Sequence, residues 1–413
     1  MKDRVTTDRV LLTVEEYLDE LLTDLLGGAG TLDGTETVPL ARALGRVLAE
    51  PVRAAADVPA FANSAMDGYA VRQVDLATIP ATLEVVGDVP AGSAEDPALA
   101  DGQCVRIMTG APLPSDADTV VPVEATDGGT QTVTVAEARD LGQHVRGAGE
   151  DVRVGAVVAE AGVTITGRVL GSLAAAGTAA VVVRRRPVVA VAATGDELVP
   201  PGSPLRRGQI FESNGTHLVA TLTELGADVR RSVVLTDDTD AFTAGLDDLT
   251  EGADLVLLTG GVSVGDFDVS RIVLEESAGG VFRHVRMQPG KPQGWARWRG
   301  VPIIALPGNP VSTAISFEVF VRPVIDVMLG RTPAPGPTVA VAGTAWRSPA
   351  GRRQLVPVQL TSDDTGRLVA TPTHRRGSAS HMVTSLAGAQ ALAVVAEETD
   401  QVEPGDLVQI RSL

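Results

Sequence analysis

Acidic and glycine-rich turns follow four apolar runs in the middle of the chain. In chain order, these turns are 194–197 (TGDE), 236–238 (TDD), 259–268 (TGGVSVGDFD) and 307–310 (PGNP). Glycines let backbone N–H groups converge on an anion, and Mg²⁺ binds one or two carboxylates together with phosphate oxygens and water. The turns therefore predict a phosphate or pyrophosphate site that is bridged by magnesium.

A simpler reading of each acidic turn is that it caps the helix that follows. An Asp or Glu directly after a single strand is more often such a cap. Three acidic turns that converge favour the shared site, because a helix cap needs no glycines.

The lysine content singles out one cation for this site. Only Lys2 and Lys291 occur in the chain, and arginine supplies the other basic side chains. Lys291 lies in the turn 288–292 (QPGKP), just before the fourth apolar run. A compact ammonium group suits an oxyanion, so we expect Lys291 to bind the anion; the alternative is a chance surface lysine.

Three further loops, in the first half of the chain, combine small residues with polar ones. They are 63–70 (NSAMDGYA), 109–112 (TGAP) and 149–152 (GEDV). The first is unusual for a strand and is typical of a loop that places Asp67 at a site. Taken singly, each loop is more typical of an ordinary turn.

Composition and motifs exclude several classes of protein. The formal charge of −18 disfavours nucleic acid and anionic membrane surfaces as partners. Cys104 is the only cysteine, which excludes an intramolecular disulfide and a cysteine-based zinc site. The longest strongly apolar stretch without a charge, 169–183, is too short to span a membrane, and the N-terminus is too polar for a signal peptide. The sequence also lacks HExxH, Walker A and GxGxxG motifs. We expect a cytoplasmic protein.

The elements that must position these turns follow from the hydrophobic pattern. Apolar runs alternate with helical stretches over residues 187–330, which predicts a parallel sheet with right-handed crossovers. In such a sheet, ligands bind beyond the carboxyl ends of the strands. Thr13 and Glu16 form a capping box at the start of a helix. Short apolar runs between turns predict β modules over 59–145 and after residue 337.

The fold class follows from this order of elements. At roughly 150 residues per domain, 413 residues predict two to four domains. We expect a multidomain α/β plus β protein. It would have a central three-layer α/β domain with a parallel sheet, and two small β modules.

The loops in their order along the chain resemble one family. The motifs NSAMDGYAVR, IMTGAPLP, GEDV, ATGDEL, GGVSVGDFD, PGKP and LPGNPVS are similar to those of the molybdopterin molybdenumtransferases. These are the bacterial MoeA proteins, which are related to the C-terminal domain of gephyrin. The resemblance implies that molybdate is the substrate inserted into adenylylated molybdopterin, with release of AMP and with Mg²⁺ as cofactor.

The resemblance also implies the residues of the site. The acidic residues implied to be catalytic are Asp67, Asp151, Glu197, Asp237 and Asp268. Of these, Glu197, Asp237 and Asp268 are expected to hold the metal. The expected substrate-binding residues are Thr109, Thr194, Gly195, Gly260, Gly261, Ser263, Gly265, Lys291, Pro307, Gly308, Asn309, Pro310 and Ser380.

Domains and partners are implied in the same way. The expected domains are an elongated, discontinuous α+β domain for dimerisation (8–57 and 145–183), an inserted β module (58–144), an α/β molybdopterin-binding domain (184–331) and a C-terminal β-barrel-like domain (332–413). Family members are homodimers whose active cleft joins the α/β domain of one subunit to the β module of the other.

One alternative is a gephyrin-like scaffold that binds a peptide loop of a membrane or cell-division partner and has weakened or absent transferase activity. Several family members have lysine where this chain has His284 and Gln288, and this loss of cations favours the scaffold. The intact set of acidic residues favours the transferase.

Overall fold

The chain divides into two compact units, which are described separately. The computed structural model describes residues 11–27, 32–137, 139–261, 269–331, 338–374 and 382–413. The main unit comprises Met1–Glu36, Gly45–Val47 and Arg184–Leu413, as far as these residues are described. The inserted unit comprises Thr37–Leu44 and Leu48–Val183.

A seven-stranded sheet forms the centre of the main unit, in the order β1-β18-β20-β21-β17-β13-β16. Its strands are β1 (Leu11–Leu12), β13 (Val188–Thr194), β16 (Asp228–Leu235), β17 (Leu255–Thr259), β18 (Val281–Val285), β20 (Pro292–Trp298) and β21 (Val301–Leu306). The four predicted strands β13, β16, β17 and β21 lie side by side and run parallel, as expected. The sheet as a whole is mixed, however, because β20 runs antiparallel to both of its neighbours.

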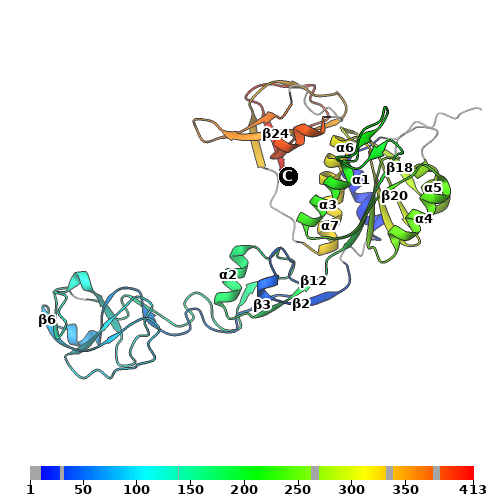
Figure 1. The fold of residues 1–413 in the computed structure, drawn as a ribbon. Helices are drawn as coiled ribbons and strands as arrows, with labels where there is room; N and C mark the ends of the chain where they lie inside the picture. The colour runs from blue at the N-terminus through cyan, green and yellow to red at the C-terminus, as the bar shows by residue number, and fades with distance from the viewer. Residues whose placement is uncertain (1–10, 28–31, 138, 262–268, 332–337, 375–381) are drawn as a thin grey trace, which may run out of the picture. The chain divides into compact units, whose positions relative to one another are not determined.

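Helices cover both faces of this sheet and confirm the three-layer α/β arrangement (Figure 1). One face carries α1 (Val14–Glu20), α3 (Asn214–Leu225), α6 (Pro310–Ser316) and α7 (Arg322–Leu329). The other face carries α4 (Thr239–Thr250) and α5 (Val269–Ala278). Among the described residues, no helix combines the length and apolar character needed to cross a membrane.

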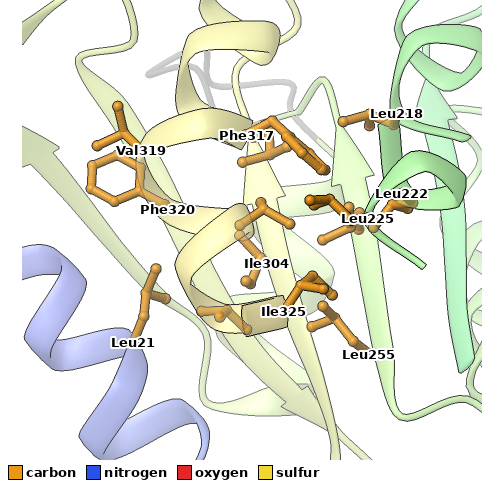
Figure 2. Packing of buried hydrophobic residues seen from close by; sticks show 14 of the residues in the cluster. Leu21, Leu218, Leu222, Leu225, Leu255, Ile304, Phe317, Val319, Phe320 and Ile325 are labelled. Atoms are coloured by element: carbon orange, nitrogen blue, oxygen red, sulfur yellow. The ribbon is translucent and has the colours of Figure 1, made fainter. Parts of the chain in front are cut away.

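Alternating strand residues explain why the core has two layers. In β21, Ile304 and Leu306 face α3 and α6, whereas Ile303 and Ala305 face α4 and α5. Figure 2 shows the first layer, in which Ile304 packs among side chains of α3 and of the segment 317–325. Burial of such apolar side chains stabilises the fold by roughly 1.5–3 kcal/mol each.

The N-terminal helix belongs to this core, which corrects the expected domain boundary. The predicted capping box is present: the N–H of Glu16 donates to Oγ1 of Thr13, and the N–H of Thr13 donates to the Glu16 carboxylate. The ring of Tyr17 is fully buried and meets Phe320 edge-on at 4.9 Å. Trp295 donates to Glu20 at 2.7 Å. Helix α1 therefore packs on the α/β sheet and not in the elongated domain of residues 8–57, because its apolar face matches this core.

The C-terminal part of the main unit is a closed barrel. Its strands, in the order in which they pair, are β24 (Arg353–Ser362), β25 (Leu368–Pro372), β22 (Thr338–Ala342), β28 (Leu407–Ser412) and β26 (Ala391–Val395). The pairing of β26 with β24 closes the ring. Apolar side chains such as Val356 and Val358 fill its interior.

The inserted unit is built mainly from strands. A five-stranded sheet consists of β8 (Thr119–Pro122), β5 (Gly68–Val71), β7 (Gln103–Ile107), β6 (Ala81–Val89) and β9 (Thr132–Val135). Short ribbons pair β3 (Val52–Arg53) with β11 (Val157–Ala159), and β4 (Asn63–Ser64) with β10 (Val145–Arg146). One helix, α2 (Gly167–Ala175), packs through the buried Leu173 beside these ribbons.

Candidate functional site

The strand register brings the acidic and glycine-rich turns to one edge of the sheet. Thr194, the last residue of β13, is paired with Leu235 at the end of β16. Thr259, the last residue of β17, is paired with Leu306 at the end of β21. The turns that follow these four strands therefore start side by side, as the sequence predicted. We call this edge the rim.

Carboxylates gather where β13 and β16 end. The N–H of Asp237 lies 3.4 Å from Oδ1 of Asp196, so these two turns touch. The carboxylate of Glu197 folds back over Gly195, where an added Cβ would lie 2.4 Å from Oε2 of Glu197. The side chains of Asp196, Glu197 and Asp237 are exposed. These carboxylates are therefore accessible to a ligand.

Asp238 behaves differently from its neighbour Asp237. It is the N-cap of α4, and its Oδ1 accepts a hydrogen bond of 2.8 Å from the N–H of Ala241. The simpler reading, that an acid after a strand caps a helix, is thus correct for Asp238. Among the described residues, Asp237 makes no such cap bond.

The glycine turns after β17 and β21 pack directly against each other. Gly260 has a φ of +96°, and a Cβ there would lie 2.5 Å from Oγ1 of Thr194. A Cβ on Gly308 would lie 3.3 Å from Cα of Gly260. Glycine is needed at Gly260 for both the φ and the close approach. The backbones of two turns and the Thr194 side chain are therefore held within contact distance.

A polar network beneath these turns was missed by the sequence analysis. The side-chain amide of Asn214 donates to Oγ1 of Thr259 at 2.9 Å and to the carbonyl of Gly308 at 2.8 Å. Oγ1 of Thr313 donates to the carbonyl of Pro307 at 2.5 Å and lies 3.3 Å from Oγ1 of Thr259. Thr259 and Thr313 are almost fully buried. A threonine that ends an otherwise apolar strand was the available signal.

Lys291, Asn309 and Pro310 also lie near this edge. Gly294 of β20 is paired with Ala305 of β21, and the two strands are antiparallel. Lys291, just before β20, is therefore at the edge where β21 ends, and it is half-buried. Asn309 is the N-cap residue of α6 without a side-chain cap bond, and Pro310 occupies the first turn. A proline suits that position because the N–H it lacks has no helical partner there.

In the inserted unit, the structure brings Asp67 and Thr109 into contact. β5 and β7 are antiparallel, with Gly68 opposite Ile107, so Asp67 before β5 lies beside Thr109 after β7. Both the N–H and the hydroxyl of Thr109 donate to Oδ1 of Asp67 at 2.7 Å. These bonds, the backbone one first, lower the pKa of the Asp67 carboxyl below its ordinary value. Asp67 is exposed and ionised at neutral pH.

Asp151 is anchored through its backbone. Its N–H donates to the carbonyl of Val58 at 2.9 Å, and its side chain is exposed. No hydrogen bond joins it to Asp67 or Thr109 among the residues the structure describes. The structure therefore leaves the two predicted acids of this unit unconnected.

Four predicted residues lie outside the described residues. They are Ser263, Gly265, Asp268 and Ser380. The predicted metal-binding set of Glu197, Asp237 and Asp268 thus has two members that can be placed, both on the exits of neighbouring strands. Within the described ranges, no group of three or more His, Cys, Asp or Glu side chains forms a metal cage. Exposed carboxylates without a cage fit Mg²⁺, which takes one or two carboxylates and completes its shell with substrate and water.

These features define a class of protein. It is a multidomain α/β protein with a closed C-terminal barrel, an inserted β unit, and carboxylates and glycine turns at one sheet edge. Three family models match the chain along most of its length. They are the MoeA N-terminal region (domain I and II) over residues 12–177, a probable molybdopterin binding domain over 190–327, and the MoeA C-terminal region (domain IV) over 339–413. The chain belongs to the MoeA family, and the predicted family is confirmed.

Individual relatives agree with this assignment. The chain is 41% identical over 388 residues to molybdopterin molybdenumtransferase 2 of Mycobacterium tuberculosis, covering 91% of this chain and 95% of that protein. It is 36% identical over 386 residues to molybdopterin molybdenumtransferase of Bacillus subtilis, covering 91% and 89%. The crystal structure of a molybdopterin biosynthesis MoeA protein from Pyrococcus horikosii superposes with a TM-score of 0.78 at 31% identity, covering 97% and 99%. The predicted multidomain fold class is confirmed.

Proposed function

We propose that this chain is a molybdopterin molybdenumtransferase that inserts molybdate into adenylylated molybdopterin and releases AMP. The general class, a transferase of molybdenum cofactor biosynthesis, follows from the relatives. They are named molybdopterin molybdenumtransferases, and the similarity covers 91% of this chain and 89% or 95% of theirs. Release of AMP, dependence on Mg²⁺ and the roles of individual residues are the finer part of the proposal. These finer points are supported by the rim, where carboxylates and glycine turns lie together.

One observation carries the proposal: carboxylate turns and glycine turns start at the same edge of four parallel strands. Asp237 touches the turn of Glu197, and Gly308 touches Gly260. An adenylate contains a phosphoanhydride, whose negative charge needs N–H donors and cations. Glycine turns can present backbone N–H groups to an anion, and Lys291 at this edge adds a point charge. The rim thus combines the groups that this substrate requires.

Magnesium completes the charge balance of this proposal. Glu197 and Asp237 are the described residues that would hold it, with Asp268 as the third predicted ligand. When bound, Mg²⁺ would neutralise charge on the phosphoanhydride. The acidic side chains would bind the cation and so orient the phosphoanhydride; they do not attack the substrate. Thr194 and Thr109 belong to the proposed substrate-binding set together with the glycines.

The homodimer and the cytoplasmic location implied above are also part of the proposal. In the homodimer, Asp67 and Asp151 of the inserted unit take part as catalytic residues. A single cysteine, which is buried, suits a reducing compartment. The alternative of a scaffold for a peptide loop gains no support from the relatives, which are named as transferases.

Complementation tests the proposed function in a cell. A strain that lacks molybdenum insertion should regain nitrate reductase activity when it expresses this chain. The Asp237→Asn variant should fail to restore activity at equal protein level. If the wild-type chain is expressed, folded and unable to complement, the proposed function is wrong.

A further inference from the structure

Three side chains from separate elements form a continuous chain of hydrogen bonds under the rim. Asn214 is the first residue of α3, Thr259 ends β17, and Thr313 lies in α6. The contacts run from the Asn214 amide to Thr259 and from Thr259 to Thr313. They end at the carbonyl of Pro307. The network therefore links a helix start, a strand end and the turn after the neighbouring strand.

The proton inventory gives this chain of bonds one consistent direction. The Asn214 amide nitrogen has two protons, and it reaches two acceptors, Oγ1 of Thr259 and the carbonyl of Gly308. Each threonine hydroxyl has one proton to donate. Thr259 then donates to the carbonyl of Pro307 at 3.2 Å, and Thr313 donates to the same carbonyl at 2.5 Å. Linked hydrogen bonds of this kind strengthen one another where water is excluded.

The network connects the two glycine turns of the rim by hydrogen bonds. Asn214 holds Thr259, whose next residue is Gly260, and it also holds Gly308 directly. These two glycines are the pair whose backbones touch, with a Cβ on Gly308 calculated to lie 3.3 Å from Cα of Gly260. Without the amide of Asn214, the only other described side-chain bond between the two turns is that of Thr259 to Pro307 at 3.2 Å.

We propose that Asn214 is a positioning residue that sets the spacing of the two glycine turns, so that their backbones are ordered before the substrate phosphates bind. This inference rests on the proposed function, since it assigns these turns to the phosphates. A merely structural role would lower stability alone. A positioning role lowers turnover in the folded protein, because small displacements of groups around a reacting centre cost large factors in rate.

The test compares variants of the full chain by AMP release, thermal stability and amide hydrogen exchange. Asn214→Ala removes both donors, and Thr313→Val removes the hydroxyl while keeping the shape; Thr313→Ser keeps the hydroxyl. Thr223→Ala is the control on the same helix, because the Thr223 hydroxyl bonds only to the carbonyl of Val219 among the described residues.

The expected result is a selective loss of turnover. Asn214→Ala should lower kcat about 10- to 100-fold at a temperature where it is fully folded, with KM changed about threefold or less. Thr313→Val should lower kcat about 10-fold, and Thr313→Ser should stay within about threefold of wild type. The double variant that combines Asn214→Ala with Thr313→Val should show a loss of kcat no larger than that of Asn214→Ala alone, since the two residues act as a unit.

Three results would overturn the inference. They are a kcat of Asn214→Ala equal to that of Thr223→Ala, no rescue by serine at position 313, and losses in the double variant that multiply. If the wild type itself releases no AMP, the proposed function fails. Hydrogen exchange of the peptides covering 259–261 and 307–310 then decides the inference alone. Exchange must rise in both turns in Asn214→Ala and in neither turn in Thr223→Ala, and any other pattern overturns it.

Discussion

The rim of the main unit and the Asp67 loop of the inserted unit hold their carboxylates in different ways. Asp67 receives two hydrogen bonds of 2.7 Å from one residue, Thr109. Among the residues that the structure describes, Asp237 donates its backbone N–H to Asp196 of a neighbouring turn, and its carboxylate is exposed. A carboxylate already bound by donors is fixed in direction and kept ionised. An uncommitted carboxylate is available to a cation. The inserted unit therefore holds the charge of Asp67 in a fixed direction, whereas the rim of the main unit leaves its carboxylates exposed.

The largest expected effect separates two neighbouring acids of the rim. Asp237→Asn or Glu197→Gln should lower AMP release by about 100-fold or more, because each removes a charged ligand from the proposed magnesium site. Asp238→Asn is the matched control: asparagine is as good an N-cap as aspartate, so its activity should stay within about twofold. Equal losses in Asp237→Asn and Asp238→Asn would break the distinction between ligand and cap.

The next effect concerns the rigidity of the glycine turns. Gly260→Ala should lower the free energy of unfolding by about 2–4 kcal/mol, because the Cβ clashes with Thr194 and the φ is unfavourable. Gly252→Ala provides the comparison, since Gly252 also has a positive φ but has no atom near an added Cβ. It should lose only about 1 kcal/mol. Urea unfolding of both variants measures the difference, and equal losses would show that the close packing of the rim contributes nothing.

A third effect tests whether the fixed carboxylate of the inserted unit is used in the reaction. Asp67→Asn removes the charge but keeps an acceptor for the N–H of Thr109, so we expect AMP release to fall about 10-fold with only a small loss of stability. Asp96→Asn is a close control, since Asp96 accepts bonds from both the N–H and the hydroxyl of Ser115 in the same unit. Its activity should not change. Equal activity of the two variants would remove Asp67 from the site.

The smallest effect is a titration. Because its hydrogen bonds lower the pKa of Asp67, the loop is stabilised above the ordinary pKa of aspartate and loses that stabilisation as the pH falls through the lowered value. Thr109→Val should raise the pKa of Asp67 toward the ordinary value, and Thr109→Ser should not. A ¹³C NMR titration of the Asp67 carboxyl measures both. An unchanged pKa in Thr109→Val would mean that the backbone bond alone holds the charge.

Much of the fold could be predicted from the sequence because the signals are periodic. The four predicted apolar runs, 187–193, 229–235, 254–258 and 302–306, are strands of one sheet, and their common direction places the turns that follow them at one edge. The position of α1 could not be predicted. Its capping box shows that a helix starts at Thr13, but the partner of its apolar face is a tertiary property. The structure shows that this partner is the α/β core.

The candidate site was predictable where a turn carries acids or glycines and unpredictable where buried polar groups support it. Asp67 and Thr109 stood out in loops of small residues, and the structure brings them together. Asn214 and Thr313 lie in helices, where an isolated polar residue is commonplace. Their role became visible only through distances to Thr259 and to the turn after β21. The sequence does not reveal which turn the side chain at the start of a helix will bond to.

We propose that the rim binds the phosphoanhydride of the substrate with the help of a divalent cation. The most direct measurement is the release of AMP from purified adenylylated molybdopterin by the wild-type chain, with molybdate and Mg²⁺ added or withheld separately. We predict AMP equal in amount to the substrate when both are present, and release at least about 100-fold slower when either is withheld. Full release of AMP without Mg²⁺, or no release of AMP with both molybdate and Mg²⁺ present, would contradict this proposal.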